Sequence, residues 1–178
     1  MYCGCNEKAI RSQQAIACAL QELMEQEPYD QISISALCRA AGVSRPTFYS
    51  LFGSKDDVVS FLLQESYSYS PAWSCDGMSE LEAMCLGYSR YITDQRHFLS
   101  LLVENAIGYL LYQSIFEALL GCDCFLPDQD ASSRRYAANF TAGGLTGIVQ
   151  DYVTRDACPP DELGLLLKRM FSGAVFCP

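Results

Sequence analysis

The segment ISISALCRAAGVSRPTFYSLFGSK, residues 32–55, decides the expected fold of this 178-residue chain. Ser33 is a good N-cap, because its hydroxyl can accept a hydrogen bond from a first-turn amide, and apolar residues then recur at helical spacing. Gly42 permits the left-handed backbone that ends one helix and turns sharply into the next. The segment therefore predicts two short helices joined at Gly42.

The second of these helices is predicted over Ser44–Phe52. Ser44 is placed to cap it, and Pro46 falls in its first turn, where the amide hydrogen that proline lacks would have been unpaired anyway. Arg45 and Thr47 should point outward from this end. The first turn of this helix is thus predicted to expose polar side chains on the protein surface.

The aromatic residues of the same helix separate an inner face from an outer one. Phe48 and Phe52 are four residues apart and share the inward face, while Tyr49 projects sideways with its hydroxyl free. Gly53 ends the helix. Lys55 then begins a third helix, where N-terminal amides and a cation together suit a phosphate.

Residues 8–64 resemble the DNA-binding domain of TetR-family transcriptional regulators. The matching parts are a leading amphipathic helix, ISISALCRAAGVS and RPTFYSLFGSKDDVV. The resemblance implies an all-α fold, with a three-helix DNA-binding domain over residues 1–54 and a helical effector and dimerisation domain over residues 55–178. It also implies a cytoplasmic homodimeric repressor that binds double-stranded DNA and that a small apolar or amphipathic effector can release.

The resemblance assigns individual DNA contacts by position. Arg45 and Thr47 correspond to residues that meet base edges, whereas Ser33, Tyr49 and Lys55 correspond to phosphate contacts. The helix start completes the predicted DNA-binding set, which is Ser33, Ser44, Arg45, Pro46, Thr47, Tyr49 and Lys55. Two copies would lie about 34–36 Å apart on a near-palindromic operator.

The charge of the predicted head keeps two other readings open. Residues 1–64 carry five basic and seven acidic side chains, within a chain of net charge −9. Few cations predict weak background binding to DNA. One alternative is a TetR-like coactivator or adaptor that dimerises and binds a protein partner without reading DNA. The other is a helical hairpin used only for packing.

Glycines in the last part of the chain predict a helix contact. Three of them lie within FTAGGLTGIVQDYV, and because glycine destabilises a helix by about 1 kcal/mol relative to alanine, they suggest close approach by another helix. The resemblance implies that this helix belongs to the second subunit of a dimer, although packing within one chain would also explain the glycines. The predicted dimer interface comprises Tyr136, Phe140, Gly143, Gly144, Gly147, Ile148, Leu163, Leu167 and Met170.

The predicted body is rich in aromatic residues that could line an effector cavity. An aromatic stripe at helical spacing is, however, more often plain core. The candidate pocket residues are Trp73, Tyr88, Tyr91, Phe98, Tyr109, Tyr112 and Phe116.

Enzymatic, cofactor and metal functions find no support in the sequence. The one histidine, His97, has no recognisable nucleophile partner, and no glycine-rich phosphate loop is present. Ten cysteines form no pair of CxxC motifs, so we expect no metal site and ordinary reduced thiols. Cys122 and Cys124, in GCDCF, are the best candidates for a thiol or metal sensor.

Membrane and secretory functions are not expected either. The most apolar region, residues 98–120, is interrupted by polar side chains, including Glu104 and Glu117. The opening sequence MYCGCNEKAIRS has no apolar stretch of its own, so it does not predict a signal peptide.

Overall fold

A computed structural model describes residues 6–68, 79–123, 125–155 and 158–173, and within these ranges the chain forms helices and turns but no strand. The predicted all-α fold is confirmed. The helices are α1 (Glu7–Met24), α2 (Ile34–Ala40), α3 (Arg45–Leu51), α4 (Lys55–Ser68), α5 (Glu80–Asp94), α6 (Arg96–Glu104), α7 (Gly108–Gly121), α8 (Ala131–Thr154) and α9 (Pro160–Phe171). None of these described helices is both long and apolar enough to span a membrane.

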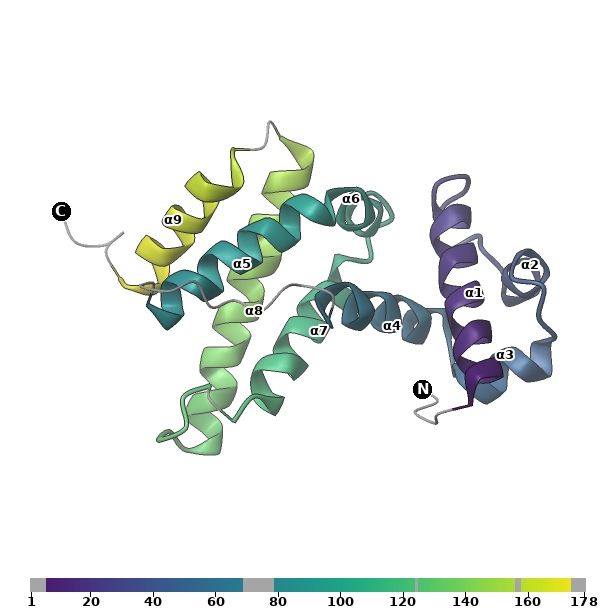
Figure 1. Cartoon of the computed structure of the whole chain (residues 1–178), viewed down its shortest axis with the longest axis horizontal. Coiled ribbons are helices and arrows are strands. Elements are labelled where there is room, and N and C mark those ends of the chain that lie inside the picture. The colour runs from purple at the N-terminus through teal and green to yellow at the C-terminus, as the bar shows by residue number, and fades with distance from the viewer. Residues whose placement is uncertain (1–5, 69–78, 124, 156–157, 174–178) are drawn as a thin grey trace.

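Helices α1 to α3 form a head at one end of the molecule (Figure 1). Its core contains Ile16 and Leu20 of α1 together with Phe48 and Phe52, all at most 1% exposed. Gly42 has φ of 65°, the left-handed conformation expected between α2 and α3. The predicted helix-turn-helix is therefore present, with the predicted inward face.

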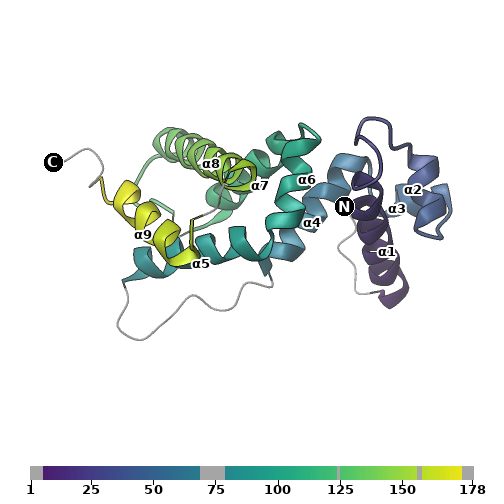
Figure 2. The same ribbon diagram turned by 90° about the horizontal axis from the view of Figure 1, so that it is seen from above.

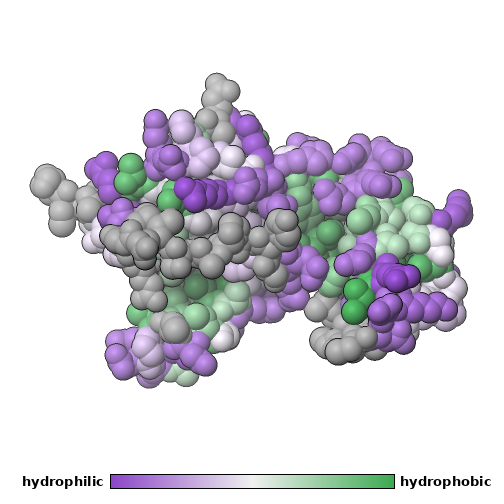
Figure 3. Space-filling model, in the orientation of Figure 1, coloured by the Kyte–Doolittle hydropathy of each residue, from purple (hydrophilic) through white to green (hydrophobic). Residues whose placement is uncertain are grey.

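Helices α5 to α9 form the body, in which α5 packs along α9 and α7 packs along α8 (Figures 1 and 2). The contact between α5 and α9 is close at Gly164, where an added Cβ would lie 3.2 Å from the Cα of Leu86. Figure 3 shows apolar surface, in green, over the lower part of the body, where α7 and α8 lie.

Helix α4 joins the two parts, because it packs against α1 in the head and against α7 in the body. Helix α6 lies at the end of the body that faces the head (Figures 1 and 2). Buried residues of head and body form one continuous apolar cluster, which runs through Val58 and Val59 of α4. The position of the head is thus set by packing as well as by chain connection.

Candidate nucleic-acid interface

The N-terminus of α3 is firmly capped. Ser44 Oγ accepts from the amide of Thr47 at 3.2 Å and lies 2.8 Å from Thr47 Oγ1. Ser44, Arg45 and Pro46 are exposed, and Thr47 is half-buried. The first turn of α3 is therefore a rigid, solvent-facing end, as predicted.

Arg45 and Tyr49 form the outward face of α3. The Arg45 guanidinium lies 6.0 Å from the centre of the Tyr49 ring, which packs edge-on against buried Phe48 with ring centres 5.4 Å apart. Tyr49 remains 50% exposed. Arg45 has no acidic partner in the described part of the chain, so its guanidinium donors are available to an acceptor outside the protein.

Ser33 also occupies the place that the sequence predicts. Its Oγ caps α2 by accepting from the amide of Ala36 at 3.1 Å, and the residue is exposed. Since a hydroxyl both accepts and donates, the cap leaves its hydrogen free to donate to a neighbouring oxygen.

Lys55 differs from its expected arrangement. Its ammonium donates to the carbonyls of Tyr29 at 2.6 Å and Ile32 at 2.7 Å, and it lies 4.4 Å from the centre of the Tyr29 ring. Burial lowers the pKa of Lys55. Lys55 thus clamps the loop between α1 and α2, and only one of its three N–H donors remains for a phosphate.

At the start of α4, where amides were expected to face a phosphate, the two amides just before the helix and that of Asp57 already have acceptors. Asp57 Oδ2 accepts from the amide of Gly53 at 2.8 Å and from that of Ser54 at 3.1 Å, while Ser54 Oγ accepts from the Asp57 amide. This reciprocal cap satisfies the amides before the helix. An anion from a ligand would therefore have to displace the Asp57 carboxylate.

Comparison with known proteins bears on this head. A family model described as bacterial regulatory proteins, tetR family, matches residues 19–60. The activator DhaS of the dhaKLM operon from Lactococcus lactis is 32% identical over 62 residues, and the regulator EthR from Mycobacterium tuberculosis is 45% identical over 49 residues. These matches cover 35% and 28% of this chain but only 33% of DhaS and 23% of EthR.

The whole fold has a counterpart as well. The crystal structure of Lin0861 from Listeria innocua superposes with a TM-score of 0.79 at 15% identity, over 100% of this chain and 97% of that one. Residues 19–60 thus belong to the tetR family of bacterial regulatory proteins.

The predicted effector residues of the body lie in separate places. Tyr88, Tyr91 and Phe98 are buried in the core, whereas Tyr112 stacks on Phe116 with ring centres 6.1 Å apart and donates to Asn139 of α8. Trp73 lies outside the described residues.

Tyr109, another candidate pocket residue, lies at the surface between head and body. It is 52% exposed, and its hydroxyl donates to Asp56 Oδ2 at 2.7 Å, at the junction between head and body. Most of the described candidate side chains therefore lie in the core or between head and body. The sequence periodicity could not separate these roles, because both place an aromatic residue once per helical turn.

Helices α8 and α9 carry the face on which a dimer was expected. Tyr136 and Phe140 are 77% and 79% exposed. Among the described residues, an added Cβ at Gly143, Gly144 or Gly147 would meet nothing within 4 Å. No described helix of the same chain therefore packs closely against these glycines, which argues against the intrachain alternative.

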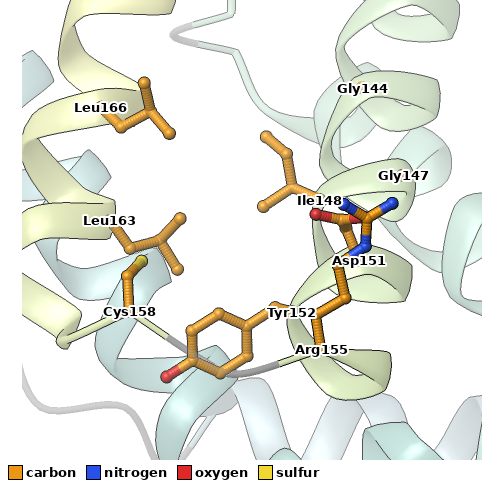
Figure 4. Close-up of a pocket in the computed structure, with 9 residues that line it drawn as sticks. All are labelled: Gly144, Gly147, Ile148, Asp151, Tyr152, Arg155, Cys158, Leu163 and Leu166. Carbon is orange, nitrogen blue, oxygen red and sulfur yellow. The ribbon is translucent and has the colours of Figure 1, made fainter.

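A hollow of about 550 Å³ separates α8 from α9 on this face (Figure 4). Gly144, Gly147 and Ile148 line it from α8, and Leu163 and Leu166 point into it from α9. Two predicted interface residues, Leu163 and Leu167, are buried within the chain, at 3% and 1% exposure. The exposed apolar residues of α9 are Leu165, Leu166, Met170 and Phe171.

The cysteines are divided between core and surface. Burial raises the pKa of the Cys38 and Cys85 thiols, which are therefore held as neutral, small apolar groups. Cys122 is exposed, while Cys124 lies outside the described residues. Among the residues that the structure describes, no group of three or more potential ligands could hold a metal ion.

Proposed function

We propose that this TetR-family protein is a homodimeric regulator that binds double-stranded DNA through the N-terminal half of α3. One observation carries the proposal: a capped helix start exposes Arg45 and Pro46 beside half-buried Thr47, and the guanidinium of Arg45 has no acidic partner within the described chain. An α-helix fits the major groove of B-DNA, and N-terminal residues of a recognition helix contact base edges.

Each side chain of this surface has a chemical role in the proposal. Arg45 can donate two parallel hydrogen bonds to a guanine, and the Thr47 methyl can contact a thymine methyl. The hydroxyls of Tyr49 and Ser33 can donate to phosphates. Lys55 contributes its one remaining donor and otherwise fixes the loop before α2.

A homodimer would use the exposed face of α8 and α9. Phe140 lies one helical turn before Gly144, so an antiparallel, two-fold crossing of α8 with its copy near Gly144 would set each Phe140 opposite the partner's glycine-lined hollow. Bare backbone in that hollow leaves room for an aromatic ring. A two-fold dimer also presents two α3 helices to the two halves of a near-palindromic operator.

The proposed sense of control is repression in the cytoplasm, because a dimer seated on promoter DNA excludes other proteins from the same stretch. A small apolar or amphipathic effector bound in the body would release it. Tyr88 supports a ligand-responsive body, because its buried hydroxyl has no hydrogen-bond partner among the described residues and would gain one from a ligand oxygen.

Fluorescence anisotropy with a labelled duplex from the DNA that flanks this gene tests the proposal. Loss of the Arg45 side chain in Arg45→Ala should weaken binding about tenfold or more, as expected for one bidentate base contact. Tyr49→Ala should weaken it less and on all sequences alike. The matched control is Arg90→Ala, which removes one exposed cation of α5, far along the chain from the head.

A specific observation favours a second candidate function, that of a TetR-like adaptor that dimerises and binds a protein partner. The ammonium of Lys55 and the amides of Gly53 and Ser54 just before α4, which could hold phosphates, have partners within the chain. An adaptor predicts a stable dimer that binds no duplex even at low salt. A regulator predicts duplex binding that Arg45→Ala weakens about tenfold or more.

A further inference from the structure

Four hydrogen bonds connect the loop between α1 and α2, the start of α4 and the corner between α6 and α7. Tyr29 Oη donates to Asp56 Oδ1, and Tyr109 Oη donates to Asp56 Oδ2, each at 2.7 Å. The Tyr29 amide donates to Asn105 Oδ1, also at 2.7 Å, and Lys55 donates to the Tyr29 carbonyl. Tyr29 and Asn105 are 76 residues apart in sequence. We call Tyr29, Asp56, Asn105 and Tyr109 the junction.

The Asp56 carboxylate is shared between head and body. One of its oxygens accepts from a tyrosine of the head loop and the other from a tyrosine of α7. Hydrogen bonds to an ionised acceptor are stronger than those between neutral groups, and Tyr29 is only 7% exposed. A rotation of the head about α4 would therefore have to break at least one of these bonds.

The corner between α6 and α7 is itself held in a defined geometry. Asn105 Nδ2 donates to the carbonyl of Leu101 at 2.9 Å, which orients the amide so that its oxygen faces Tyr29. The next residue, Ala106, has φ of 57°, an uncommon conformation for a residue with a Cβ. Amides at this corner are nonetheless paired, since Ala106 donates to Val103 and Ile107 to Leu102. The corner thus places both Asn105 and Tyr109 toward the head.

We propose that Asn105 and Tyr109 are positioning residues, which fix the orientation of the head on the body and so set the separation of the two α3 helices in a dimer. The proposal rests on the proposed function. Neither residue touches DNA. Their role is to make the protein selective for one distance between half-sites, a property that a recognition helix alone cannot supply.

A second head–body contact provides a matched control. His97 Nε2 lies 2.7 Å from Glu25 Oε1, but the two side chains are 66% and 47% exposed. Exposed ion pairs contribute little, because water screens them and both side chains must be ordered. Breaking this pair with His97→Ala should therefore leave the orientation of the head unchanged, in contrast to changes at the junction.

The first test measures affinity for duplexes that carry two half-sites, taken from sequences that the wild type selects, at varied spacing. Wild type should bind duplexes whose spacing is altered by two base pairs about tenfold more weakly than its optimum. The junction variants should bind duplexes of optimal and of altered spacing nearly equally, and their affinity for a single half-site should not change. These variants are Tyr109→Phe, Asn105→Ala and the double variant. Unchanged spacing selectivity in Tyr109→Phe, which keeps the ring and loses only the hydroxyl, would overturn the proposal.

The second test needs neither DNA nor a dimer. Spin labels attached through noncanonical residues at positions 50 in α3 and 90 in α5, both exposed, report the distance between head and body within one chain. The distance distribution should be narrow in wild type and in His97→Ala, and broad in Tyr109→Phe. Equal distributions contradict the positioning role. If wild type selects no DNA but the distributions differ as expected, the proposed function fails and the positioning role stands.

Discussion

At the scale of single residues, the side chain that departs most from its expected role is Lys55. Its place at the start of a helix, next to free amides, is typical of a phosphate contact. In the structure the ammonium instead holds two carbonyls of the loop before α2, and Asp57 covers the amides. The sequence could not predict this, because Tyr29 and Ile32 are more than twenty residues away along the chain.

Lys55 should therefore contribute more to stability than an ordinary surface lysine. Lys55→Met leaves the carbonyls of Tyr29 and Ile32 without their donor and should lower the free energy of unfolding by about 2 kcal/mol. Urea denaturation followed by circular dichroism measures the change. Arg39→Met, at an exposed position of α2, should change stability little, and an equally small effect of Lys55→Met would show that the clamp is unimportant.

The junction tyrosines predict a loss of stability at high pH. Burial and then the hydrogen bond to Asp56 raise the pKa of Tyr29, and the hydrogen bond to Asp56 raises that of Tyr109. Because the folded pKa lies above the unfolded value of about 10, the stabilisation is complete below pH 10 and is lost as the pH rises further. Urea midpoints should therefore fall from about pH 10 upward, and less steeply in Tyr29→Phe. A pH profile identical to that of wild type would argue against this assignment.

At the scale of helices, capping residues and apolar spacing in the sequence predicted where helices begin. They did not predict which helices pack together. Ser33 and Ser44 cap α2 and α3 as predicted, because a cap acts on amides two or three residues away. Ser79 caps α5 in the same way. The pairing of α5 with α9 depends on contacts distant in sequence and was not predicted. Leu163 and Leu167 were consequently assigned to a partner instead of to this chain's own core.

Gly164 is the residue that the α5–α9 contact requires. Gly164→Val adds Cβ and two methyl groups where the Leu86 backbone lies 3.2 Å from an ideal Cβ, so it should lower the free energy of unfolding by about 1–3 kcal/mol through overpacking. Thermal denaturation gives the comparison with Gly121→Val, where nothing lies within 4 Å of an added Cβ. Similar melting temperatures for the two variants would mean that α9 can shift freely on α5.

At the scale of the whole molecule, helices α8 and α9, with their exposed apolar residues, and helix α3, with its exposed first turn, lie toward opposite ends of the described chain (Figures 1 and 2). The sequence indicated both, through the glycines of α8 and through the start of α3. It could not indicate the junction that links them, because Tyr29, Asp56 and Tyr109 meet only once three separate segments have folded.

The exposed face of α8 predicts a dimer that one substitution can dissociate. Phe140→Glu puts a charge on a side chain that is 79% exposed in one chain but buried in the proposed dimer, so it should raise the dissociation constant at least about a hundredfold, or about 2.7 kcal/mol. Sedimentation velocity measures the change. Arg90→Glu is the control. A monomeric wild type, or an unchanged Phe140→Glu dimer, would contradict the assignment of this face.

Selection of bound sequences from a random pool of double-stranded DNA tests whether two copies of α3 read one duplex together. We expect enrichment of an inverted repeat whose half-site centres lie about ten base pairs apart, with loss of the guanine-containing position in a pool selected by Arg45→Ala. Failure of the wild-type chain to enrich any sequence at low salt, or the same motif emerging with Arg45→Ala, would contradict the proposal.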